Sequence, residues 1–509
     1  MFVNLGVRDF LDRAEIVYPD RVGMVDEPDQ PAPSWGEKTY AEMAALARGQ
    51  AARLDELGVP VGGRVAIVSQ NAARLLTSFF GVSGWGRILV PVNFRLAPAE
   101  VEYIVEDSGA EVLLLDPEVE HLAETVTAKH VFVLGRDDEK IFGRAGAPSE
   151  PKPWAGDENA TATINYTSGT TARPKGVQLT HRNLWLNATV FGMHVALTDN
   201  DVLLHTLPMF HANGWGMPFA ATGVGIKHVV LRKVDGGEIL RRVRDQGVTV
   251  MCAAPAVVTA ALDAAAEWDG PIPGSGTVRV ICAGAPPPTR VIHRVRYELG
   301  WEFIQIYGLT ETSPLITVNR ERAEWAGDDP MEVARRLGRA GAPALGVTLK
   351  IDEDGEILTR TNHALTAYWN KPAETAAALE GDWFHTGDRG TFEGGYLTIA
   401  DRKKDVIISG GENVTSIEVE DALALHPAVR EVAVIGIPDE KWGELVTAIV
   451  VADGVTAEEL IAHTREHLAG YKCPKRIDFV DSLPRTATGK IQKFVLRAPF
   501  WDALERKVN

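Results

Sequence analysis

Short apolar runs alternate with segments of helical hydrophobic spacing through the first three quarters of the chain. Parallel strands that helices cover on both faces are apolar along their whole length, whereas strands with one solvated face alternate apolar and polar residues. The runs here are nearly uninterrupted, and amphipathic segments separate them, so the pattern predicts an α/β fold with parallel sheets. The predicted strands are RVAIVS (64–69), ILVPVN (88–93), EVLLLD (111–116), HVVL (228–231), VTVMCA (248–253), VRVICAG (278–284) and EFIQIYG (302–308).

The last quarter has a different pattern, which begins at the charged segment DRKKD (401–405). Two predicted helices open with capping-box spacing, at Thr415/Glu418 and Thr456/Glu459, and three apolar strands accompany them. This arrangement indicates a compact α+β unit of roughly 110 residues, which is large enough to fold by itself. We place the boundary at the charged segment, with one domain at 1–400 and a second at 401–509.

Composition and charge exclude several classes of protein. The 509 residues are 45% apolar and carry a net charge of −17, which argues against a nucleic-acid binder. The three cysteines form no CxxC pair or Cys/His cluster, so we expect neither a disulfide framework nor a zinc site, and a reducing, cytoplasmic compartment fits. No apolar run approaches the ~18–20 residues of a membrane span, so we expect no transmembrane segment, and transient contact with a membrane surface stays open.

The segment YTSGTTARPKG (166–176) follows a short apolar run and concentrates hydroxyls, glycines and a lysine. Glycines let backbone N–H groups approach a ligand closely, hydroxyls add donors and lysine adds charge, so the inventory suits a polyphosphate. An exposed turn has a similar composition and remains the alternative. The loop is not a Walker A loop, because Pro174 lacks an amide donor and Lys175 is followed by glycine.

Four further segments combine residues that could carry chemistry, although each also has an ordinary structural reading. In IYGLTETSP (306–314) an aromatic residue, a hydroxyl and an acid follow a strand, at the edge where open α/β sheets bind ligands. In WFHTGDRG (383–390) a carboxylate in a tight turn could accept two ribose hydroxyls, or form an Asx turn. LPMFHANGWG (207–216) could line an apolar pocket, and LPRTATGK (483–490) ends in a lysine that could equally be a solvated surface charge.

Taken together and in this order, the five motifs resemble those of the adenylate-forming enzymes, which include acyl-CoA synthetases, aryl-CoA ligases, luciferases and adenylation domains. The resemblance extends from about residue 10 to about residue 500. It implies an α/β fold with a large N-terminal domain of doubly wound sheets and a distorted β-barrel-like subdomain. A small, mobile α+β C-terminal domain completes this acetyl-CoA synthetase-like fold.

The resemblance also implies a two-step reaction that uses ATP, Mg²⁺ and coenzyme A. A carboxylate attacks the α-phosphate of ATP to give an acyl-adenylate and pyrophosphate, and a thiol then displaces AMP. By the family motifs, Lys490 bridges carboxylate and α-phosphate, Thr167 and Glu311 lie on the metal, and all three are catalytic. The phosphate clasp consists of Thr167, Ser168, Gly169, Thr170, Thr171 and Lys175.

The same resemblance assigns the remaining site residues. For the adenine and its motif they are Gly284, Ala285, Pro286, Tyr307, Gly308 and Thr310, and for the ribose Asp388 and Arg402. Asp401 matches the hinge, Gly410 and Gly411 the wall of the pantetheine tunnel, and Tyr471 and Lys475 the contact with the CoA nucleotide. The acid-binding residues are His211, Trp215, Gly216, Gly284 and Gly308.

The segment PMFHANGWGMPFAATGVG (208–225) resembles those of medium- and long-chain fatty acyl-CoA synthetases, which implies a medium- or long-chain fatty acid as substrate. Its glycines are small enough to leave room for an alkyl chain, and its lack of a basic residue weighs against dicarboxylates. Aryl or short-chain acids remain open, as do transfer to a carrier-protein thiol and a non-catalytic descendant of such enzymes. The last of these would be expected to lack Lys490 or Glu311, and both are present. Ala172 stands where the family usually has glycine, and alanine would be strained by about 1 kcal/mol if that position needs a positive φ. We expect the loop tip to tolerate it and the enzyme to be active, and weaker or slower ATP binding stays open. A homodimer is left open.

Overall fold

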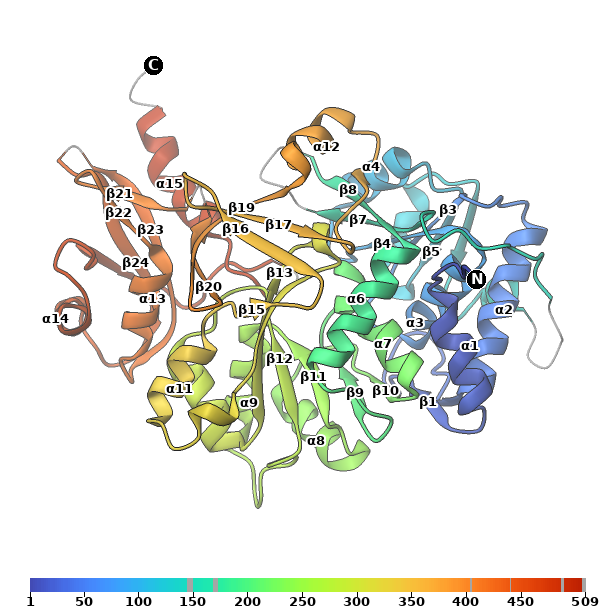
Figure 1. The fold of residues 1–509 in the computed structure, drawn as a ribbon, viewed down its shortest axis with the longest axis horizontal. Coiled ribbons are helices and arrows are strands. Elements are labelled where there is room, and N and C mark those ends of the chain that lie inside the picture. The colour runs from blue at the N-terminus through green and yellow to red at the C-terminus, as the bar shows by residue number, and fades with distance from the viewer. Residues whose placement is uncertain (144–149, 168–172, 403–404, 440, 487–488, 506–509) are drawn as a thin grey trace.

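The computed structural model describes residues 1–143, 150–167, 173–402, 405–439, 441–486 and 489–505. Two large sheets, a small antiparallel sheet and a separate C-terminal sheet follow one another across the molecule (Figure 1). The helices before the C-terminal sheet are α1 (Arg8–Val17), α2 (Tyr40–Glu56), α3 (Ala73–Gly81), α4 (Pro98–Ser108), α5 (Asp138–Phe142), α6 (His181–His194), α7 (Met217–Val224), α8 (Gly236–Gln246), α9 (Pro255–Ala266), α10 (Thr289–Arg294), α11 (Pro330–Leu337) and α12 (Pro372–Ala378).

The first large sheet has the strand order β18-β8-β7-β4-β3-β5-β6. Its pairs from β7 through β4, β3 and β5 to β6 are parallel, and β8 and β18 add antiparallel partners at one edge. The strands are β3 (Arg64–Val68), β4 (Ile88–Val92), β5 (Val112–Leu115), β6 (His130–Val133), β7 (Thr161–Thr167), β8 (Lys175–Thr180) and β18 (Ala367–Tyr368).

The second large sheet has nine strands in the order β15-β14-β13-β12-β11-β9-β10-β1-β2. The pairs from β1 to β13 are parallel, whereas β2, β14 and β15 pair antiparallel at the two edges. The strands are β1 (Val22–Val25), β2 (Glu37–Thr39), β9 (Val202–His205), β10 (Lys227–Val230), β11 (Val250–Ala253), β12 (Arg279–Cys282), β13 (Glu302–Gly308), β14 (Leu315–Asn319) and β15 (Ala342–Pro343).

Burial explains why the apolar runs became parallel strands. Every residue of β4, β5 and β11 is buried, as expected for strands that are covered on both faces. The predicted doubly wound α/β fold is therefore confirmed. A third, four-stranded antiparallel sheet takes the place implied for the barrel-like subdomain. Its strands are β16 (Val347–Ile351), β17 (Glu356–Thr361), β19 (Phe384–Glu393) and β20 (Tyr396–Arg402).

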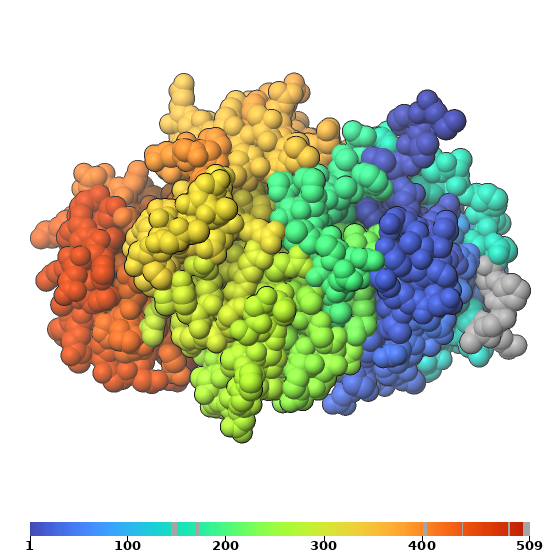
Figure 2. All heavy atoms as spheres, turned by 60° about the horizontal axis from the view of Figure 1, so that its bottom comes forward, coloured from blue at the N-terminus to red at the C-terminus, as the bar shows by residue number. Residues whose placement is uncertain are grey.

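The elements from β21 to α15, here called the C-terminal unit, form a sheet with helices on both faces at the left of Figure 1. One apolar cluster packs this sheet against α13 and α14, and another packs it against α15. Its elements are β21 (Ile407–Ser409), β22 (Glu412–Val414), α13 (Ser416–Ala424), β23 (Val429–Asp439), β24 (Gly443–Ala452), α14 (Ala457–His467), β25 (Arg476–Phe479) and α15 (Lys493–Glu505). In Figure 2 this unit lies directly against the yellow part of the chain.

One of the two predicted capping boxes is wrong. Thr456 and Glu459 form the box at the start of α14, with the Thr456 hydroxyl accepting from the Glu459 amide. At α13, however, Thr415 makes no side-chain cap. The Glu418 carboxylate that would complete that box instead accepts from Nζ of Lys472 at 2.7 and 2.8 Å. An ion pair with a distant lysine has replaced the local contact.

No helix in the described parts of the chain is both long and apolar enough to cross a membrane.

Candidate active site

Lys490 reaches from the C-terminal unit into the cleft beside the second large sheet. A Cβ atom built on Gly284 would lie 3.4 Å from Cε of Lys490, and one built on Gly489 would lie 3.3 Å from Cβ of Ala254. Within the loop, the amide of Lys490 donates to Oγ1 of Thr486 at 3.1 Å, and the amide of Thr486 donates to the Lys490 carbonyl at 2.7 Å. The loop therefore brings its ammonium group to the carboxyl end of β12.

Glu311 is a carboxyl group of the predicted set on which the charge of Lys490 acts. Burial raises the pKa of Glu311, while a backbone hydrogen bond, the hydroxyl of Tyr368 and the charges of Lys175 and Lys490 act in the opposite direction. A buried carboxyl group whose pKa is raised gains more than an exposed one from a bound divalent cation. The oxygen donors and ammonium groups here fit Mg²⁺ together with anionic phosphates.

Tyr368 joins two members of this group, and the sequence analysis did not single it out. Its hydroxyl donates to Oε1 of Glu311 at 2.8 Å, and Nζ of Lys175 lies 4.5 Å from the centre of its ring. The lysine therefore lies over the ring of Tyr368, and the carboxylate lies at its hydroxyl. The only signal in the sequence was a tyrosine in LTAYWN (365–370), which gives no indication of its partners.

The two ends of the predicted phosphate loop pair with each other. Thr167 at the end of β7 is opposite Lys175 at the start of β8 in the antiparallel ladder. The Thr167 hydroxyl lies 3.5 Å from the Lys175 carbonyl oxygen. The residues between them that were predicted to bind phosphate, and Ala172, lie outside the described residues; they are Ser168, Gly169, Thr170 and Thr171.

The predicted nucleoside residues come together at the adjoining strand ends. The hydroxyl of Tyr307 donates to Oδ2 of Asp388 at 2.8 Å. Asp388 pairs with Arg402 in the ladder between β19 and β20, and Arg389 pairs with Asp401. The backbone therefore places the predicted ribose pair and the predicted hinge next to each other.

Glycine is required at two positions near this group. Gly284 lies two residues after the end of β12 and has φ +99°. Gly284 and Pro286 are exposed, and Ala285 between them is half-buried. A Cβ atom on Gly308 would lie 1.5 Å from the carbonyl oxygen of Pro314, so no other residue fits at the end of β13. Thr310 follows in a short 3₁₀ turn (Thr310–Thr312).

Three of the predicted acid-binding residues lie at a buried left-handed turn, Ala212–Gly216: His211 precedes it, and Trp215 and Gly216 belong to it. Its five residues all have positive φ, between 38° and 79°, and Trp215 has φ 57°. Non-glycine residues in this conformation cost about 1–2 kcal/mol each, so the surrounding structure must hold the turn. Asn213 supplies one restraint, because its amide donates to Oγ1 of Thr163 at 2.9 Å.

At this turn the side chain of His211 is half-buried and that of Trp215 is buried. Burial and, to a smaller extent, the charge of Lys490 lower the pKa of His211 to about 3, so the imidazole is neutral. Trp215 is 4% exposed and packs in a cluster with Leu207, Ala212 and Met217. A Cβ atom on Gly216 would lie 2.5 Å from Nδ2 of Asn187, which explains the glycine.

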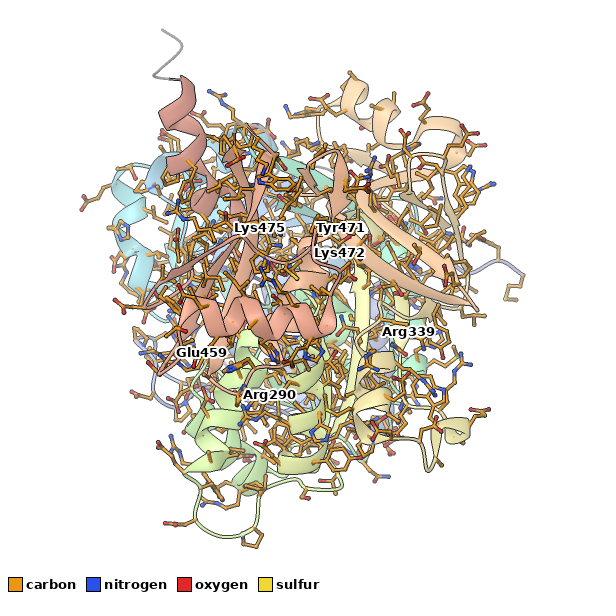
Figure 3. The ribbon with its side chains drawn as sticks, turned by 90° about the vertical axis from the view of Figure 1, so that its left-hand side faces the viewer. Arg290, Arg339, Glu459, Tyr471, Lys472 and Lys475 are labelled. Carbon is orange, nitrogen blue, oxygen red and sulfur yellow. The ribbon has the colours of Figure 1, made fainter. Side chains whose placement is uncertain are left out.

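The predicted thioester-stage residues lie elsewhere on the C-terminal unit. Gly410 and Gly411 form the turn between β21 and β22 with φ of 61° and 85°, and the Gly410 amide donates to the Trp442 carbonyl at 2.7 Å. Tyr471 and Lys475 lie near each other on the side of the unit that faces the viewer in Figure 3. The described structure thus brings Lys490, but not these four residues, to the cleft.

Two parallel-sheet halves, a third sheet and a C-terminal unit that delivers a lysine to the strand ends define an adenylate-forming enzyme. The sequence matches the AMP-binding enzyme family over residues 11–369 and the AMP-binding enzyme C-terminal domain over residues 418–490. The chain belongs to this family. It is an AMP-forming acid–thiol ligase of the acyl-CoA synthetase type, and enzymes of this kind use ATP, Mg²⁺ and CoA.

Individual relatives extend over almost the whole chain. The chain is 35% identical to 4-hydroxybutyrate–CoA ligase 2 of Metallosphaera sedula, covering 96% of this chain and 93% of that one. It resembles the structure of a Mycobacterium tuberculosis fatty acyl CoA synthetase, with 31% identity, a TM-score of 0.74 and coverage of 98% and 99%. It also resembles the anthranilate CoA ligase AuaEII in complex with anthranoyl-AMP, with 28% identity, a TM-score of 0.87 and coverage of 98% of each chain.

Proposed function

We propose that the protein activates a medium- or long-chain fatty acid to its acyl-adenylate and then to its acyl-CoA. The observation that carries the activation step is the position of Lys490, whose side chain lies against Gly284 and whose charge acts on both His211 and Glu311. An ammonium group at this place can neutralise a carboxylate and an α-phosphate as they meet. The two anions could otherwise approach only against their mutual repulsion.

Other residues of the chain hold the phosphate end of the nucleotide in this proposal. Lys175 faces the β- and γ-phosphates, and the Thr167 hydroxyl and the Glu311 carboxylate provide oxygen donors beside it. Bound Mg²⁺ would supply charge neutralisation of the pyrophosphate leaving group. Asp388, positioned by the hydroxyl of Tyr307, accepts from the ribose hydroxyls.

The fatty-acid assignment is supported by the charge-free wall of the acid-binding segment. No Asp, Glu, Lys or Arg occurs in 208–225, and the one histidine there is neutral because burial lowers the pKa of His211 to about 3. Such a wall accepts an apolar tail and offers no partner for a second charged group.

A short-chain or aryl acid is the second candidate, and the packing of Trp215 favours it. The indole is 4% exposed inside an apolar cluster, so a long alkyl chain would have to displace it. Two of the relatives described above act on 4-hydroxybutyrate and anthranilate, which are a short acid and an aryl acid.

For the thioester step we propose that the domain 401–509 rotates about Asp401 relative to the domain 1–400. The rotation withdraws Lys490 and brings the Gly410–Gly411 turn to the acyl-adenylate, where two glycines leave a passage for the pantetheine thiol. Tyr471 and Lys475 then meet the CoA nucleotide. A carrier-protein thiol is the alternative acceptor.

The test is pyrophosphate release by purified protein with Mg·ATP and a panel of butyrate, octanoate, palmitate, benzoate and anthranilate, with and without CoA. The proposal expects release that depends on the acid, peaks at octanoate or palmitate, and yields acyl-CoA and AMP when CoA is present. A peak at butyrate or an aryl acid would select the second candidate. If none of the five acids caused pyrophosphate release, both candidate substrate classes would be contradicted.

We also propose a cytoplasmic location, because the three cysteines are all free, buried thiols. A homodimer is a further proposal, which the molar mass from sedimentation velocity would test.

A further inference from the structure

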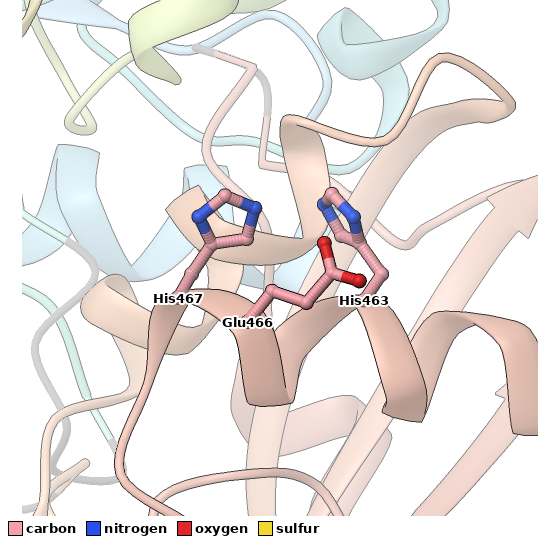
Figure 4. Close-up of side chains that lie close together, drawn as sticks. All are labelled: His463, Glu466 and His467. Carbon is pink, nitrogen blue, oxygen red and sulfur yellow. The ribbon is translucent and has the colours of Figure 1, made fainter.

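Helix α14 carries three potential metal ligands on one turn, away from the cleft that holds Lys490. His463, Glu466 and His467 each offer a ligand atom, and these atoms all lie within 4.8 Å of one another. The two histidines are four residues apart, so they share one face of the helix. Figure 4 shows both rings and the carboxylate on the same side of the helix, with the carboxylate beside the ring of His463.

The hydrogen bonding of His463 fixes which of its nitrogens is available. Nε2 of His463 lies 3.1 Å from the carbonyl oxygen of Ala422 in α13. A carbonyl can only accept, so Nε2 carries the proton and the lone pair is on Nδ1. Histidines that bind metal commonly donate their other N–H to a carbonyl or carboxylate in this way, which orients the ring. Burial, followed by the neighbouring His467 and His426, lowers the pKa of His463 and favours this neutral form.

A third histidine nearby is oriented as a donor instead. The rings of His426 and His463 have centroids 5.1 Å apart. The amide of Ala428 donates to Nδ1 of His426 at 3.2 Å, so the proton of neutral His426 is on Nε2. His426 therefore borders the cluster without offering a lone pair to it.

We propose that α14 binds one Zn²⁺ ion through Nδ1 of His463, an imidazole nitrogen of His467 and the carboxylate of Glu466. Two imidazoles and a carboxylate form a donor set that zinc accepts readily, with water completing the coordination. Bond lengths of about 2.0–2.2 Å require the three ligand atoms to approach one another more closely than 4.8 Å. Glu466 and His467 are exposed, so their side chains can make this movement.

The spacing H-x-x-E-H at 463–467 escapes a search that begins from cysteine patterns, which is why the sequence predicted no zinc site. The three cysteines are buried, and none of them belongs to the cluster of His463, Glu466 and His467. The site is independent of the proposed acid substrate, since no residue of the cleft takes part.

The test is isothermal titration of the tag-free, EDTA-treated full-length protein with ZnCl₂ in a non-coordinating buffer without ATP. We expect one saturable site per chain. His463→Gln and His467→Gln should each weaken zinc binding by more than about tenfold, and Glu466→Gln should weaken it by less. His121→Gln, which removes an exposed histidine on another element, is the matched control and should bind as the wild type does.

Cobalt provides a second readout, because Co²⁺ bound by imidazole and carboxylate in a four-coordinate site absorbs visible light. The wild type should show this absorption and the double variant His463→Gln/His467→Gln should not, while both retain the same thermal unfolding temperature without metal. Zinc binding of equal affinity in the double variant and the wild type, or no saturable binding in the wild type, would overturn the proposal.

Discussion

Tyr368 shows how much of this site depends on a single hydroxyl. It donates to Glu311 and supports Lys175 with its ring, although neither partner is near it in the sequence. Lys490, Glu311, Lys175, Tyr307 and Asp388 could each be singled out from the sequence, because each belongs to a short motif of recognisable chemistry. The hydrogen bond between Tyr307 and Asp388 could not, because their motifs lie far apart in the chain. Tyr368 could not, since its contribution arises only when the strands β8 and β18 pair and bring its ring to Lys175.

The variant Tyr368→Phe keeps the ring and removes one hydrogen bond to Glu311. Loss of a bond to a charged group costs about 1.5 kcal/mol, and the pKa of Glu311 should rise further because that bond favours its charged form. We expect the Mg²⁺ concentration for half-maximal pyrophosphate release to increase about tenfold. Tyr297→Phe, at an exposed position, is the control. An unchanged Mg²⁺ requirement would show that Tyr368 only packs.

Lys490→Ala removes the ammonium group from the cleft and should act on one half-reaction only. We expect acyl-adenylate formation to fall by at least about 100-fold, which corresponds to the loss of about 2.7 kcal/mol of charge stabilisation. Thioester formation from synthetic acyl-AMP should persist, because the proposed rotation withdraws Lys490 before that step. The rates of adenylate formation and of thioester formation are measured separately. An equal decrease in both rates would count against a role of Lys490 in adenylate formation alone.

Trp215→Ala opens space in the apolar cluster behind the left-handed turn. We expect the preferred acid to become longer while the KM for ATP changes little, since the proposed function places the indole at the acid and not at the nucleotide. The cavity should also lower the free energy of unfolding by about 3–5 kcal/mol. Rates with C4 to C16 acids provide the measurement. The same acid preference in variant and wild type would remove Trp215 from the pocket.

At the scale of elements, α13 connects the C-terminal unit to α10 of the large domain. The amide and the hydroxyl of Thr289 donate to the two oxygens of Asp421 at 2.8 and 3.0 Å, and Arg290 donates to the carbonyl of His426 at 3.1 Å. These contacts hold the unit in the orientation that inserts Lys490. The sequence pattern predicted the helix α13 but not its contact with α10. That contact joins side chains more than 130 residues apart, which no local pattern reveals.

Asp421→Asn keeps the shape of this contact and removes its charge. A hydrogen bond to a charged acceptor contributes about 1.5–3 kcal/mol, so the orientation with Lys490 in the cleft should become less populated. We expect slower adenylate formation, by about fivefold or more, and no slowing of the thioester step. Asp453→Asn alters an exposed carboxylate elsewhere on the same unit and serves as the control. Parallel losses in both half-reactions would contradict the prediction.

At the scale of the whole molecule, stability should depend on pH through histidines buried in the large domain. His205 and His228 are both completely buried, and Nε2 of the first lies 2.9 Å from Nδ1 of the second. Burial lowers the pKa of His205 to about 3 and that of His228 well below its ordinary value. The pair is stable in the core only while both rings are neutral.

Because these pKa values are lower in the folded than in the unfolded protein, the unfolded state binds more protons below pH 6.5. The contribution of these neutral histidines to the free energy of unfolding is therefore fully present above pH 6.5. It decreases as the pH falls towards 3, by about 1.4 kcal/mol per pH unit for each histidine. Urea unfolding at pH 7.5 and 5.0 measures the loss. His228→Gln should show a smaller difference between the two pH values, and an identical difference would contradict the prediction.

The burial of all three cysteines affects how safely the enzyme can handle an activated acyl group. Cys282 ends the strand that leads to Gly284, so a sulfur atom lies two residues from the place where a mixed anhydride would form. Burial raises the pKa of both Cys252 and Cys282, which keeps them as thiols and withholds the nucleophilic thiolate. An acyl-adenylate that waits there for coenzyme A would therefore meet no thiolate from Cys252 or Cys282, and we expect these two cysteines not to be acylated.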